Sequence, residues 1–221
     1  MLRRLIGHEM TRDIKDFESK VDLICDVFEP HLRFLPGMSR NSRDWAMDNL
    51  INLASVSHLV TFPGLVEILS DLGFSVSGTS PRFIADWAWY EDAALELDFF
   101  NRSALRSYWV NAHGFIDYKN TYTPRSEESK KQLEGMCKKI HLAISVYEVS
   151  NDQTLRSSIL DDIVELSESL KTDMPFVYDA LKEVLLWISQ TSIDPDKIKK
   201  STGFGSWFGR SQTYVAFTLG K

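Results

Sequence analysis

Cysteine is scarce in this sequence of 221 residues, which contains only Cys25 and Cys137. Neither belongs to a CxxC pair or to a Cys/His cluster with the spacing of metal ligands. We therefore expect both thiols to be reduced and buried, as free cysteines commonly are. The sequence predicts no disulfide framework and no metal site, and nothing in it calls for a cofactor.

Long hydrophobic runs are missing too. The densest apolar stretch, residues 184–188, is far shorter than the roughly 18 residues that a membrane-spanning helix needs. At the N-terminus, Arg3 and Arg4 are followed by residues 7–11 with the polar sequence GHEMT, where a signal peptide would have its apolar core. These absences predict a cytoplasmic protein without a membrane span.

Basic charge is in the minority, with 25 basic against 31 acidic side chains and a net charge of −6. Such a balance disfavours a broad phosphate-binding surface, so nucleic acid is not the first expected partner. The P-loop, the glycine-rich dinucleotide motif, HExxH, GxSxG and the protein-kinase signature are also missing. Most nucleotide-dependent enzymes are thereby excluded.

What the sequence does contain is helical periodicity. The apolar fraction of 43% and the charged fraction of 25% are ordinary for a folded domain. Apolar residues recur at spacings of three and four, as in helices with one buried face. The pattern predicts helices over about 9–28, 42–62, 63–72, 82–100, 133–147, 155–170 and 174–190, with Asp173 capping the last of these and a short helix opening at Asp194.

The predicted fold is therefore all-α or nearly so, a single domain (1–221) of about seven to eight helices. A loop at 117–123 leaves open a weak subdivision into 1–118 and 124–200 with a tail, 201–221.

Two segments break the helical pattern. Residues 74–80 are expected to form a loop, and the glycine-aromatic stretch 203–209 a turn with packed aromatic rings. Residues 214–219 have the β-branched and aromatic make-up of a strand. That strand could pair with an edge elsewhere in the chain, pack as an extended segment or add to another protein's sheet.

A candidate catalytic face lies in the segment 98–118, where Arg102, Arg106, Trp109 and His113 share one side of a helix. A guanidinium can hold a phosphate while an imidazole transfers a proton during RNA cleavage. Residues 106–113 resemble the Arg-x4-6-His motif of the HEPN superfamily, helical proteins many of which are ribonucleases of defence and toxin systems. The resemblance implies a metal-independent ribonuclease that uses Arg106 and His113, acts on RNA and forms a homodimer.

The same residues also have a structural interpretation. Arg102 can pair with Asp98 one turn away, and Arg106 can meet a carboxylate of another helix. His113 can stabilise the C-terminal end of its helix through the helix dipole. Both interpretations stay open at the level of sequence.

Acidic and aromatic residues alternate just before this segment. Di-metal carboxylate helices need a Glu-x-x-His pair, and the sequence has none. Exposed Trp and Tyr side chains instead supply binding energy at interfaces. The candidate partner-binding residues are Trp87, Trp89, Tyr90, Glu91, Asp92 and Glu96.

The leading hypothesis is a cytoplasmic, protein-binding or regulatory helical protein, for example an acidic inhibitor or immunity-type protein, whose partner is another protein. The alternative hypothesis is the HEPN-like ribonuclease, with Arg106 and His113 as its catalytic pair and Arg102 beside them.

Overall fold

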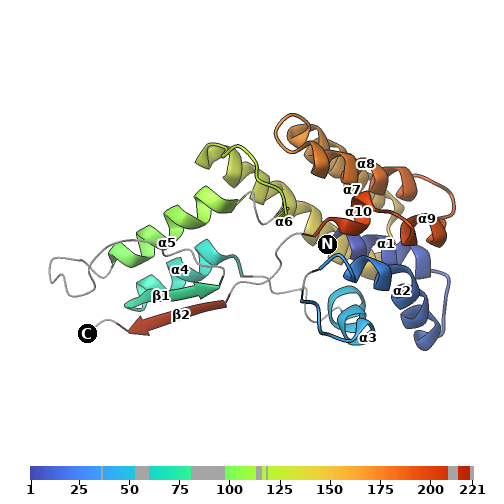
Figure 1. Cartoon of the computed structure of the whole chain (residues 1–221), viewed down its shortest axis with the longest axis horizontal. Helices are drawn as coiled ribbons and strands as arrows, with labels where there is room; N and C mark the ends of the chain where they lie inside the picture. The colour runs from blue at the N-terminus through green and yellow to red at the C-terminus, as the bar shows by residue number, and fades with distance from the viewer. Residues whose placement is uncertain are drawn as a thin grey trace. The chain divides into compact units, whose positions relative to one another are not determined.

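The computed structural model is mainly α-helical, as the sequence predicts (Figure 1). It describes residues 1–35, 37–52, 60–80, 98–112, 116–117, 119–208 and 214–219. Close contacts between residues group the chain into two units. Unit 1 comprises Met1–His58 and Leu133–Phe208, and unit 2 comprises Leu59–Gln132 and Gly209–Lys221.

Unit 1 begins with two helices, α1 (Leu2–Thr11) and α2 (Phe17–Leu32). The prediction of one helix over 9–28 is wrong, because the chain is interrupted at 12–16. Asp16 starts α2 by accepting a hydrogen bond of 2.8 Å from the backbone N–H of Ser19, as an N-cap residue does. Apolar spacing continues across the interruption, so periodicity alone does not reveal it.

The sequence also predicts that Pro30 ends this helical segment, but Pro30 lies inside the last turn of α2. A proline there removes one backbone hydrogen bond near the helix end. The buried neighbours Phe28, His31 and Leu32 hold the turn in place.

The helix predicted from Ser42 starts at that residue but changes its winding after one turn. Helix α3 (Ser42–Ala46) continues into a π-helical turn, η1 (Met47–Ile51). Asn52 then has an extended backbone. The rest of the predicted helix, residues 53–59, lies outside the described residues.

Three longer helices agree with the prediction: α6 (Glu127–Ser150), α7 (Gln153–Leu170) and α8 (Pro175–Ile188). The division between the two units falls within α6. The predicted cap of α8, Asp173, is wrong, because Met174 occupies the N-cap position and makes no side-chain capping bond.

The segment after α8 adds two short helices, α9 (Pro195–Lys199) and α10 (Gly203–Ser206). Asp194 caps α9 as predicted, through a hydrogen bond of 3.0 Å from the backbone N–H of Asp196. Helices α7 and α8 pack against each other, α9 packs against α2, and α10 packs against α8. The core of unit 1 includes the fully buried side chains of Leu5, Phe28, Ile144, Ile163, Leu181 and Phe204.

Unit 2 contains α4 (Phe62–Asp71) and α5 (Asp98–Asn111). The sequence predicts Pro63 in the first turn of α4 and Gly73 just after its end, and both are confirmed, Gly73 with a positive φ of 81°. The N-cap, Thr61, was not predicted.

A two-stranded antiparallel sheet completes unit 2, formed by β1 (Phe74–Ser80) and β2 (Tyr214–Leu219). The predicted C-terminal strand is confirmed, and it pairs with an edge inside the chain. The prediction of a loop at 74–80 is wrong. Serine, glycine and threonine make that segment look like a loop, and its partner strand is at the other end of the sequence.

The core of unit 2 lies between the sheet and its two helices, since both α4 and α5 contact β1 (Figure 1). Phe62 and Val66 of α4 meet Val76 of β1 and Ala104 of α5. Four partly buried side chains, Leu105, Tyr108, Val215 and Phe217, extend this cluster.

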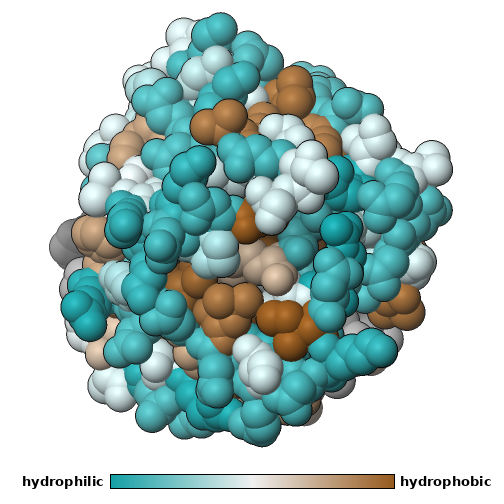
Figure 2. Space-filling view, turned by 90° about the vertical axis from the view of Figure 1, so that its right-hand side faces the viewer, coloured by the Kyte–Doolittle hydropathy of each residue, from teal (hydrophilic) through white to brown (hydrophobic). Residues whose placement is uncertain are grey.

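On the face drawn in Figure 2 most residues are hydrophilic, and hydrophobic residues form several groups among them. None of the helices in the described ranges combines the length and the apolar content that crossing a bilayer requires.

Candidate functional site

The candidate arginines of α5 are both exposed, but they differ in their partners. Arg102 pairs with Asp98 across one helical turn, with 2.8 Å between Nη1 and Oδ2. This part of the structural interpretation is confirmed. Arg106 makes no ion pair with any residue that the structure describes. His113 lies outside the described residues, so its pairing with Arg106 stays a prediction.

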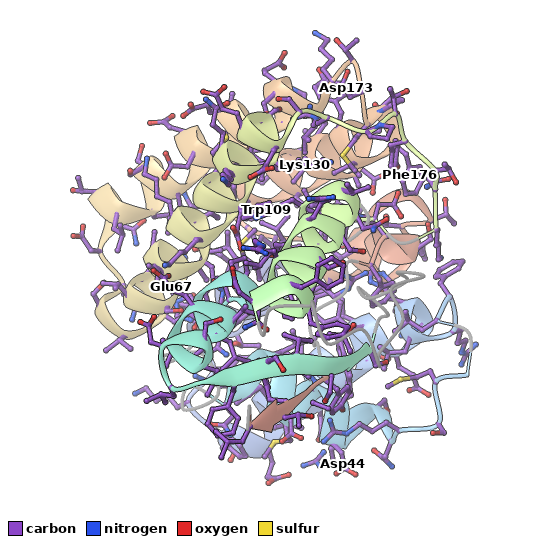
Figure 3. The ribbon with its side chains drawn as sticks, turned by 90° about the vertical axis from the view of Figure 1, so that its left-hand side faces the viewer. Asp44, Glu67, Trp109, Lys130, Asp173 and Phe176 are labelled. Carbon is purple, nitrogen blue, oxygen red and sulfur yellow. The ribbon has the colours of Figure 1, made fainter. Side chains whose placement is uncertain are left out.

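Trp109, predicted on the same face, takes part in the packing between α5 and the start of α6. The Lys131 ammonium lies 5.5 Å from the centre of its indole ring. Next to Lys131, buried Lys130 donates a hydrogen bond of 3.0 Å to the backbone carbonyl of Val110. The side chains of Lys130 and Trp109 are labelled in Figure 3. A cation at the C-terminal end of a helix is stabilising, so these lysines fix the end of α5.

The six predicted partner-binding residues, Trp87 to Glu96, all lie in the segment 81–97, outside the described residues. Their role therefore stays a prediction.

A surface that the sequence analysis missed lies on the outer side of α6. Ile140, Ile144 and Tyr147 of this helix are buried. Leu142, Val146 and Val149 are 49%, 58% and 71% exposed and follow one another at spacings of four and three. With 3.6 residues per turn, these positions lie on the side of the helix away from the buried residues. We call these three side chains the α6 outer stripe.

Basic residues adjoin the outer stripe. Lys138, one turn before Leu142, is exposed and has no ion pair within the described ranges. Lys139 pairs with Asp162 of α7, with 2.6 Å between Nζ and Oδ1, and this hydrogen bond raises the pKa of Lys139. In the sequence, this surface is visible only as a second series of apolar residues in a helix whose buried side already has one.

A polar pocket of about 360 Å³ lies where the end of α1, the start of α7 and the residues after α8 meet. Glu9, only 4% exposed, accepts hydrogen bonds from the Tyr147 hydroxyl and from Arg156 Nε, the latter at 3.1 Å. Arg156 also donates to the carbonyl of Ile188. Burial and the bond to Glu9 raise the pKa of Tyr147.

Arg12 and Asp13 also line this pocket. Arg12 Nη1 is 3.9 Å from Glu9 Oε2, and Arg12 Nε is 3.9 Å from Asp13 Oδ1. Both separations exceed the length of a hydrogen bond. The side chain of Asp13 is 92% exposed and that of Arg12 is 35% exposed, so a ligand can reach both charges.

Both cysteines are free and partly buried, rather than fully buried as expected. Burial raises the pKa of the Cys137 thiol to about 11, which keeps this thiol protonated and weakly nucleophilic. In the part of the chain that the structure describes, no three His, Cys, Asp or Glu residues are grouped to hold a metal ion.

No protein-family model, curated protein or solved structure matches the chain. Function is therefore argued from the side chains and their surroundings. The HEPN resemblance rests on the Arg106 to His113 segment alone.

Proposed function

We propose that the chain is a cytoplasmic, protein-binding regulatory protein that docks an acidic amphipathic helix of another protein on the α6 outer stripe. The observation that carries this proposal is the set of three exposed apolar side chains, Leu142, Val146 and Val149, facing away from the core. Covering apolar surface stabilises a complex by roughly 25 cal/mol per Å² before the costs of association are counted.

The spacing and charge of this face specify the partner. Anchors at i, i+4 and i+7 match the way in which one helix packs along another. The exposed ammonium of Lys138 beside Leu142 favours a partner with carboxylates next to its apolar residues. An inhibitor or immunity-type protein, which acts by covering the surface of another protein, is a concrete form of this function.

The experiment begins with capture of the tagged chain's partner from native lysate, followed by measurement of Kd with the purified partner. Val146→Glu, which places a charge in the middle of the stripe, should weaken binding by at least about tenfold. Val164→Glu is the control, because Val164 is 43% exposed on the neighbouring helix α7 and lies outside the stripe. Lys138→Glu should weaken binding through charge repulsion.

Equal affinity of the wild type and Val146→Glu would show that the stripe is not the docking surface. The acidic-aromatic residues then provide the second arm of the test. If that segment also contacts the partner, replacing Glu91, Asp92 and Glu96 by Lys should weaken partner binding. Its aromatic anchors would be Trp87, Trp89 and Tyr90.

The second candidate function is the metal-independent ribonuclease. It is favoured by the exposed guanidinium of Arg106, which is not engaged by any described carboxylate and can contact a phosphate. Arg106→Ala and His113→Ala should each abolish RNA cleavage by the purified protein in the presence of a chelator. Arg33→Ala, which removes an exposed arginine outside this segment, is the control for a general loss of positive charge. Wild-type protein without nuclease activity would remove this candidate.

A further inference from the structure

The polar pocket at the end of α1 is built on a fixed base. The carboxylate of Glu9 is held by the Tyr147 hydroxyl and by Arg156, and Arg156 is tied to the carbonyl that ends α8. These bonds connect α1, α6, α7 and α8 within unit 1. This part of the lining is already ordered, so it loses little conformational entropy when the pocket binds a ligand.

The pocket is balanced in charge. It is lined by two guanidiniums, of Arg12 and Arg156, and by two carboxylates, of Glu9 and Asp13. Glu9 and Arg156 satisfy each other through a hydrogen bond. Arg12 and Asp13 remain side by side, opposite in charge and not hydrogen-bonded to each other.

We propose that this pocket binds a free polar α-amino acid. The carboxylate of an amino acid can accept two parallel N–H bonds from the guanidinium of Arg12, while its adjacent ammonium pairs with Asp13. A simple anion could pair only with Arg12 and a simple cation only with Asp13, and each would meet the like charge of the neighbouring residue. A ligand that carries both charges on neighbouring atoms meets neither penalty.

The other residues that line the pocket indicate which side chain the bound amino acid would carry. The lining also includes Gln153, Gln190, Thr191 and Ser192, whose side chains are amides or hydroxyls. A volume of about 360 Å³ leaves room for a ligand side chain as well as the two charged groups. The pocket therefore suits an amino acid with an amide or hydroxyl side chain, for which L-glutamine is the probe.

The test is calorimetric titration of the full chain with L-glutamine at constant ionic strength. We expect saturable binding that Arg12→Gln and Asp13→Asn each weaken at least about tenfold. Arg33→Gln and Asp161→Asn are matched controls, because they remove the same charges from exposed positions outside the pocket lining and should leave binding unchanged. Arg12 lies partly in solvent and Asp13 almost wholly, so neither replacement should disturb folding.

Two ligand analogues sharpen the result. N-acetyl-L-glutamine lacks the ammonium and L-glutaminamide lacks the carboxylate, so both should bind more weakly than L-glutamine. Absence of saturable binding up to millimolar concentration would overturn the proposal, and so would affinity that Arg12→Gln and Asp13→Asn leave unchanged. Neither result bears on the α6 outer stripe, which Val146→Glu tests separately.

Discussion

The backbone of Gly205 lies directly against the imidazole ring of His31. A Cβ at position 205 would be 2.9 Å from His31 Cδ2 and 3.0 Å from Nε2. The ring has little freedom to move, because Nε2 bonds to the carbonyl of Ile198 at 2.8 Å and aromatic rings flank it at Phe28 and Phe204. Glycine is therefore required at 205 by this close approach.

Gly205→Ala should destabilise the protein by about 1–3 kcal/mol, because the added methyl group must displace a buried ring. Urea unfolding measures the effect. Gly135→Ala is the matched control, since a Cβ there has no neighbour within 4 Å and the residue lies inside α6. That control should stabilise by about 0.5–1 kcal/mol. Equal stability of Gly205→Ala and the wild type would refute the contact.

Stability should fall as the pH is lowered from about 6.5 to about 4. Burial lowers the pKa of His31 from 6.5 to about 4. The unfolded chain therefore takes up a proton over this range that the folded chain does not, which favours unfolding. The total effect is on the order of 3 kcal/mol.

His31→Gln isolates this contribution, because glutamine keeps a hydrogen-bond donor and does not titrate. Its unfolding free energy, measured by urea at several pH values, should be lower at neutral pH and should lose less on acidification. His8, whose pKa is also lowered by burial, and the carboxylates contribute in both proteins. If the two pH profiles run parallel, His31 is not the titrating group.

Removing either partner of the buried Arg4 and Glu148 pair should destabilise unit 1 by about 3–5 kcal/mol, because the other charge is left uncompensated. Arg4 Nε lies 2.7 Å and 2.6 Å from the two Glu148 oxygens, and Nη1 donates to the carbonyl of Asn52. Burial raises the pKa of Glu148 and Arg4 opposes that shift.

The double variant Arg4→Met/Glu148→Met should be more stable than either single variant in thermal unfolding. Arg102→Met breaks an exposed pair and should cost less than about 1 kcal/mol. Additive effects of the two buried substitutions would argue against this coupling.

Asn101→Leu should loosen unit 2, because Asn101 joins α5 to both α4 and β1. Its side-chain oxygen accepts a hydrogen bond of 2.7 Å from the Val76 N–H, and its amide donates to Ser70 Oγ and the Phe74 carbonyl. We expect a cost of about 1–3 kcal/mol and faster hydrogen exchange of the Val76 amide. Asn111→Leu, exposed on the same helix, should leave that exchange rate unchanged.

Several elements were predictable because the signals that define them are local. Pro63 and Gly73 bound α4, and Asp194 followed by Pro195 opens α9. Capping and proline placement depend on backbone groups within one turn, which a sequence displays directly. The interruption between α1 and α2 escaped detection because the apolar spacing runs through it.

Strand β1 was not predicted because its defining interactions are not local. Its residues are mostly small and polar, and the hydrogen bonds that make it a strand come from β2, for example between the partners Phe74 and Leu219. Pairing between distant segments has no local signature. The α6 outer stripe also needed the structure, because a sequence with two apolar series on one helix does not state which series is buried.

By itself, the sequence determined the helical class, most of the longer helices and the absence of common catalytic motifs, because periodicity and capping act over a few residues. Tertiary structure decided which distant groups meet. The Arg3 guanidinium lies 3.8 Å from the centre of the Phe208 ring and donates to the carbonyls of Phe204 and Gly205. Glu9 likewise reaches Arg156 only because α1 and α7 meet at one pocket. Such contacts arise from the burial of helix faces against one another, which no short stretch of sequence encodes.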